Sequence, residues 1–265
     1  TTTEPGKELK PLPVEGDSTL ADLELLYPFL RSRQYNVNFI GGFNALNSET
    51  DVTNINIAKD RVRTVRIGSR FDFADELAGV NSFDLMLTKG VDWLGATEDG
   101  LGRSKANGDH TGFRTNLTAS RLQDFGYGFS ALLSGSGQYS PDALLSSEEF
   151  SLGGAEFGRA YDSGEITGDK GVSGNLELRY ANQIDRDIVK AYEVYTYYDI
   201  GKVWNKDPVV GEEPSESLAS AGIGTRFNLS HDFSGYIELT KPLTRDVEAE
   251  NDDDSRVFMS ITKRF

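Results

Sequence analysis

Apolar and polar side chains alternate along most of the chain after about residue 20. The carboxyl-terminal segment shows the pattern clearly, because Val257, Met259 and Ile261 fall on one face of an extended strand while Ser260 and Thr262 fall on the other. One such strand also fits the edge of a soluble sheet, but the alternation recurs throughout the chain. Stretches of useful length with a helical period are missing. The pattern predicts an all-β protein.

About eleven strands follow from this alternation, and the connections between them are alternately short and long. A transmembrane barrel with tight turns at one end and longer loops at the other produces this rhythm, whereas a soluble sandwich has no reason to keep it. We therefore predict an antiparallel transmembrane outer-membrane β-barrel. The expected strands lie near residues 21–30, 35–47, 61–73, 81–94, 113–120, 127–139, 172–180, 189–205, 218–229, 235–243 and 256–265.

Composition fits a barrel with a wet interior. Only 37% of the 265 residues are hydrophobic, and the polar strand faces hold more charged and amide side chains than a dry core accepts. Residues 20–265 are assigned to the barrel domain, and its longest loop, residues 140–171, is rich in glycine. Residues 1–19 are predicted to be a linker or a truncated end, which leaves room for a twelfth strand.

The sequence offers little for covalent or metal chemistry. Cysteines are absent, and neither His110 nor His231 lies beside a second ligand or a nucleophile motif such as Gly-x-Ser-x-Gly. The acidic run at residues 246–254 lacks the spacing of an EF-hand and is interpreted as a solvated loop. A net charge of −15 argues against nucleic acid. We predict no enzymatic activity, no cofactor and no metal site.

The glycine-rich loop and the two strands after it carry a recognisable set of residues. Gly158, Arg159, Ala160 and Tyr161 are consecutive in the loop. Together with Glu177-Leu178-Arg179 and Asp199-Ile200-Gly201, this segment resembles the haemolysin-activator transporters of two-partner secretion, the ShlB/FhaC/HecB family, within the superfamily of the barrel-assembly insertase. The resemblance covers most of residues 20–265.

In that family the loop carries an Arg-Gly-Tyr or Arg-Gly-Phe core, folds back into the lumen, and pairs its arginine with an inward-facing aspartate. Ala160 departs from the family's glycine. Side-chain parity independently places Asp199 on the same strand face as Glu193. The resemblance thus implies a lumen loop motif of Gly158, Arg159 and Tyr161, and lumen strand partners Glu177, Asp199 and Gly201.

Complete family members have sixteen strands preceded by two POTRA domains, so the chain is expected to be the carboxyl-terminal part of such a barrel. The resemblance implies a bacterial outer-membrane pore that exports a partner exoprotein, with loop 140–171 as plug or latch. An outer-membrane insertase and a passive diffusion porin remain alternatives. The expected partners are the secreted exoprotein, outer-membrane lipid and lipopolysaccharide, and the barrel-assembly machinery, which would read Ile261 and Phe265 as an assembly signal.

Overall fold

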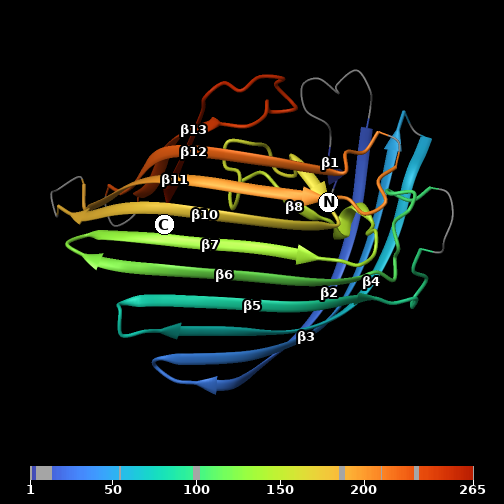
Figure 1. The fold of residues 1–265 in the computed structure, drawn as a ribbon, viewed down its shortest axis with the longest axis horizontal. Helices are drawn as coiled ribbons and strands as arrows, with labels where there is room; N and C mark the ends of the chain where they lie inside the picture. The colour runs from blue at the N-terminus through green and yellow to red at the C-terminus, as the bar shows by residue number, and fades with distance from the viewer. Residues whose placement is uncertain are drawn as a thin grey trace.

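The computed structural model describes residues 2–3, 14–53, 55–97, 102–184, 189–209, 211–229 and 233–264. They form one antiparallel sheet of twelve strands in sequence order, interrupted only by a small β8–β9 sheet between β7 and β10 (Figure 1). This confirms the all-β prediction. The strands are β1 (Thr2–Thr3), β2 (Val14–Arg31), β3 (Tyr35–Val52), β4 (Ile55–Ala74), β5 (Gly79–Gly90), β6 (Phe113–Gly126), β7 (Phe129–Tyr139), β8 (Phe150–Leu152), β9 (Ile166–Gly168), β10 (Lys170–Gln183), β11 (Ala191–Trp204), β12 (Ser215–Asn228), β13 (Phe233–Pro242) and β14 (Arg256–Lys263).

The two faces of the sheet reverse the arrangement of a soluble protein. On β11, the apolar side chain of Ile200 is 52% exposed on the outer face, while Asp199 on the inner face is fully buried. On β14, Met259 is 77% exposed. An apolar exterior around a polar interior is the arrangement of a barrel wall in lipid. The described residues include no helix of the length and hydrophobicity needed to cross a membrane.

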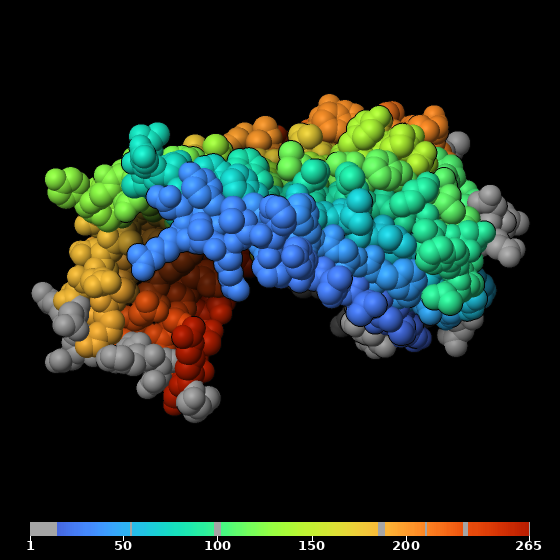
Figure 2. Space-filling view, turned by 90° about the horizontal axis from the view of Figure 1, so that it is seen from below, coloured from blue at the N-terminus to red at the C-terminus, as the bar shows by residue number. Residues whose placement is uncertain are grey.

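The sheet curves into a trough without closing. Figure 2 shows β2, in blue, and the carboxyl-terminal strands, in red, on opposite sides of a hollow. In the strand order, β1 with β2 forms one edge and β14 forms the other. The curved surface encloses the inner face of strands β10 to β13, and the loop between β7 and β10 lies against that face (Figure 1).

The amino-terminal part of the sheet extends further than the alternation predicts. β2 begins at Val14, inside the segment expected to be a linker, because β3 continues to Val52 and the two residues pair. Thr2 and Thr3 pair with Asp17 and Gly16, so β1 supplies the twelfth strand. Residues 1 and 4–13 lie outside the described residues.

Candidate functional site

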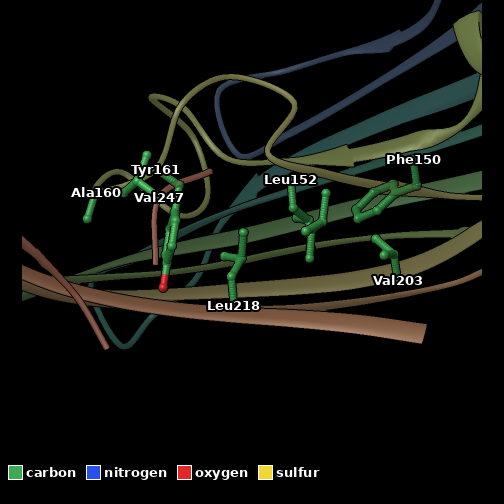
Figure 3. Close-up of a cluster of buried hydrophobic side chains, with 8 residues drawn as sticks. Phe150, Leu152, Ala160, Tyr161, Val203, Leu218 and Val247 are labelled. Atoms are coloured by element: carbon green, nitrogen blue, oxygen red, sulfur yellow. The ribbon is translucent and has the colours of Figure 1, made fainter. Parts of the chain in front are cut away.

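The long loop between β7 and β10 folds as a hairpin onto the inner wall. Its stem is the antiparallel pair of β8 and β9, in which Phe150 faces Gly168 and Leu152 faces Ile166. Apolar side chains of the loop pack on the wall residues Val203 and Leu218 (Figure 3). The buried cluster comprises Phe150, Leu152, Ala160, Tyr161, Ile166, Val203, Leu218 and Val247. The loop is therefore held by a small apolar core inside an otherwise polar surface.

Glycines in the wall make room for the hairpin. A Cβ atom at Gly201 would lie 2.4 Å from Leu152 Cδ1, and one at Gly171 would lie 2.0 Å from Phe150 Cδ1. Real Cβ atoms do not approach other atoms so closely. Gly201, which the sequence places among the lumen strand partners, thus contacts the hairpin stem rather than Arg159.

The Arg159 side chain reaches the wall at Asp199. Its Nε and Nη2 atoms donate to the two Asp199 carboxylate oxygens at 3.1 and 3.0 Å, which is a bidentate contact. The backbone N–H groups of Gly158 and Arg159 also donate to Asp199 Oδ2, at 3.1 and 3.0 Å. Asn175 donates to Oδ1 at 2.5 Å. This fully buried carboxylate fixes both the side chain and the backbone of the loop.

Three further wall residues surround the guanidinium, and one of them is Glu238, whose Oε2 lies 3.9 Å from Arg159 Nη1. Arg159 Nη1 donates to Glu177 Oε2 at 2.6 Å. The guanidinium carbon of Arg159 also lies 3.3 Å from the centroid of the Tyr197 ring. Burial opposes the charged form, but the hydrogen bonds and charge of Asp199, followed by those of Glu177, raise the pKa of Arg159 above its ordinary value. Arg159 therefore stays charged at every physiological pH.

The residues beside Arg159 adapt the loop backbone to this position. Gly158 has a φ of +85°, a conformation that suits glycine, and a Cβ there would lie 2.7 Å from Leu218 Cδ1. Ala160 is fully buried and its carbonyl accepts a hydrogen bond from Arg256 Nη1 at 3.0 Å. The hydroxyl of Tyr161 donates to the backbone carbonyl of Ala219 at 3.1 Å. The motif is anchored to the wall residue by residue.

A second charged cluster holds the base of the loop. The Nζ atom of Lys105 lies 2.5 Å from Glu149, 3.2 Å from Asp169 and 3.0 Å from Glu212. Burial opposes the charge, but the hydrogen bonds to Glu149 and Glu212 and nearby carboxylates raise the pKa of Lys105. Asp169 also accepts from the backbone N–H of Leu144 at 2.6 Å. This cluster joins the β5–β6 loop, the long loop and the β11–β12 loop.

The structure thus brings together Arg159, Asp199 and Glu177, and it places Tyr161 and Gly201 on other parts of the same loop–wall contact. The sequence pattern gives no sign of the roles of Tyr197 and Asn175, although each lies two residues from a predicted partner on the same strand face. The Lys105 cluster is equally invisible in the sequence, because loop residues that are distant along the chain carry no local signal of their proximity.

The predicted assembly signal is only partly described. Ile261 is 69% exposed on the outer, apolar face of β14. Phe265 lies outside the described residues. Among the residues that the structure covers, histidine and acidic side chains form no group suited to a metal ion.

The reversed faces and the inward loop define the class as a bacterial outer-membrane β-barrel protein. The sequence model of the family described as haemolysin secretion/activation protein ShlB/FhaC/HecB matches residues 3–227, and the chain belongs to this family. The family match, together with the solved structures described next, confirms the fold, the family and the localisation expected from the sequence. No curated protein matches the chain.

Solved structures show the same fold. CdiB from Escherichia coli superposes with a TM-score of 0.81 at 20% identity, over 96% of this chain and 46% of that one. CdiB from Acinetobacter baumannii gives 0.74 at 18% identity, over 96% and 43%. BamA from Haemophilus ducreyi lacking POTRA domains 1-3 gives 0.63 at 12% identity, over 95% and 55%. The chain spans less than half the length of the two CdiB structures.

Proposed function

We propose that this chain forms part of the wall, and the plug loop, of an outer-membrane pore that exports a partner exoprotein. Membership of a secretion/activation family supports this function. The observation that carries the proposal is the loop itself, because it occupies the inner face and is fixed there by Arg159 on Asp199 and Glu177. A polypeptide crossing the pore needs that space, so the loop acts as a latch that closes the lumen at rest.

The partners follow from this function. The exoprotein is the cargo, the exposed apolar face contacts lipid and lipopolysaccharide, and the barrel-assembly machinery inserts the wall into the membrane. Neither nucleic acid nor an enzymatic step enters the proposed mechanism. Transport through the pore needs only release and return of the loop.

Arg159→Ala and Asp199→Ala test the latch in cells that also produce the partner exoprotein. Both variants are expected to reach the outer membrane at normal levels and to secrete at least tenfold less exoprotein, because a loop that no longer returns to the wall cannot complete the cycle of release and return. Lys202→Ala is a suitable control, because this residue lies on the exposed face of β11 and its ammonium contacts Trp204. Full secretion by both latch variants would contradict the proposal.

The insertase alternative predicts a different result. If the protein assembles other barrels, the same substitutions should lower the amounts of other outer-membrane proteins while exoprotein release stays unchanged. Steady conductance of the purified wild-type protein in planar bilayers would instead indicate a passive porin.

A further inference from the structure

Glu177 is shared among three guanidinium groups. Arg159 Nη1 lies 2.6 Å from Oε2, while Arg226 Nη1 and Arg179 Nε lie 2.9 and 2.7 Å from Oε1. The Glu177 side chain is only 3% exposed. Arg159 belongs to the loop, whereas Arg179 and Arg226 belong to β10 and β12. Glu177 therefore keeps two cations when the loop leaves the wall.

Asp199 has no comparable second cation among the described residues. Within the described part of the chain, Arg159 is its only cationic partner. Its remaining side-chain contacts are neutral, with Asn175 at 2.5 Å and Ser220 at 3.4 Å. Its other donors are backbone N–H groups of the loop, at Gly158 and Arg159. When the loop leaves, Asp199 loses the one cation that pairs with it among the described residues.

Arg226 is held beside Glu177 by the wall alone. Its guanidinium carbon lies 3.8 Å from the centroid of the Tyr195 ring, and its Nη1 also donates to Glu193 at 2.5 Å. The Tyr195 hydroxyl in turn donates to Glu238 at 2.7 Å. None of these contacts involves the loop, so Arg226 is positioned before and after the loop moves.

The space around Arg226 allows this exchange. Its side chain is 41% exposed, and it lines a cavity of about 430 Å³ between the loop and the wall. Arg159, Tyr161 and Glu238 line the same cavity. Both guanidinium groups that contact Glu177 thus border the same cavity.

We propose that Arg226 is a positioning residue that, together with Arg179, replaces Arg159 on Glu177 when the loop leaves, so that this buried carboxylate keeps a cation. An unpaired buried charge is strongly unfavourable, and Arg226 and Arg179 together remove this penalty from Glu177. In the closed state Arg226 also shares the charge of Glu177 and thereby weakens its contact with Arg159. This inference rests on the proposed role of the loop as a latch.

The sign of one effect separates this role from a merely structural one. If Arg226 exchanges with Arg159, its removal leaves Glu177 with one wall cation, Arg179, so that Glu177 depends more on Arg159 and the loop is held more tightly. If Arg226 only supports the geometry of the site, its removal loosens the loop. Arg226→Lys should behave as the wild type, because both glutamate contacts of Arg226 use the single Nη1 atom and an ammonium can replace it.

The chain contains no cysteine, so Ser220→Cys provides a single reporter beside the buried Asp199 carboxylate. Reaction of that thiol with a membrane-impermeant maleimide in intact cells reports how often the loop leaves. We expect Arg226→Gln to slow labelling about tenfold, which corresponds to about 1.4 kcal/mol. Arg70→Gln is the control, since Arg70 pairs with Asp84 on another part of the sheet.

Faster or unchanged labelling in Arg226→Gln, together with faster labelling in Arg159→Ala, would overturn the exchange and leave the latch intact. If Arg159→Ala does not accelerate labelling, this result would contradict the latch itself, and with it the proposed function. Arg226→Lys guards against misfolding of the glutamine variant, because slowed labelling in the lysine variant would equally contradict an exchange of charge.

Discussion

The guanidinium of Arg159 stacks on the ring of Tyr197, with 3.3 Å between the guanidinium carbon and the ring centroid. Tyr197 is 4% exposed, and its hydroxyl has no hydrogen-bond partner among the described residues. The ring therefore contributes to the site and the hydroxyl does not. A cation over an aromatic ring away from water contributes about 2 kcal/mol.

Tyr197→Phe is accordingly expected to keep the loop closed. Tyr197→Leu should destabilise the closed position of the loop by about 2 kcal/mol. Trypsin cleavage after Arg159 measures this, because the protease must take the Arg159 side chain away from its carboxylates. Equal cleavage rates in the phenylalanine and leucine variants would contradict the contribution of the ring.

Gly201→Ala should displace the hairpin stem, because the new Cβ would lie 2.4 Å from Leu152 Cδ1. Overpacking of this kind costs about 1–3 kcal/mol. Gly174→Ala is the matched control, since a Cβ there would meet its nearest atom at an ordinary 3.9 Å. Faster trypsin cleavage is expected only in the Gly201 variant; the same rate in both would show that the stem does not depend on the wall glycine.

Lys105→Met should loosen the base of the loop and destabilise the barrel by about 3–5 kcal/mol, because it leaves Glu149 and the fully buried Asp169 without their shared cation. Lys206→Met is the comparison, since that side chain is 40% exposed and lies 3.7 Å from Asp207. An exposed pair contributes only about 0–1 kcal/mol. Urea unfolding of both variants measures the difference. Similar urea midpoints for the two variants would contradict the stabilising role of the buried Lys105 cluster.

The Lys105 cluster should not respond to pH between about 7 and 10. The pKa of Lys105 is raised above its ordinary 10.5 in the folded protein. A raised pKa contributes stability that is fully present below the unfolded value and is lost only as the pH rises through the folded value. The difference in unfolding free energy between wild type and Lys105→Met should therefore stay constant over this range, and a steady decline from pH 7 would contradict the assignment.

The architecture was predictable because the alternation of side chains has a period of two and repeats over many strands. Parity alone placed Asp199 on the inner face, and the family resemblance supplied Arg159 as its partner. Side-chain parity gives the face of a strand but not how far a side chain reaches. The stacking of Arg159 on Tyr197 and the sharing of Glu177 between Arg159 and Arg226 are therefore visible only in the structure. The linker expectation failed at Val14 because short-range pattern does not show how far the neighbouring strand continues.

The labelling of Ser220→Cys during secretion tests the central claim most directly. The thiol lies buried beside Asp199 under the closed loop, and it becomes accessible only when Arg159 leaves. We expect rapid labelling in cells that export the exoprotein and slow labelling in cells that lack it. Equally slow labelling while secretion proceeds at its normal rate would show that the loop stays in place, and would contradict the account.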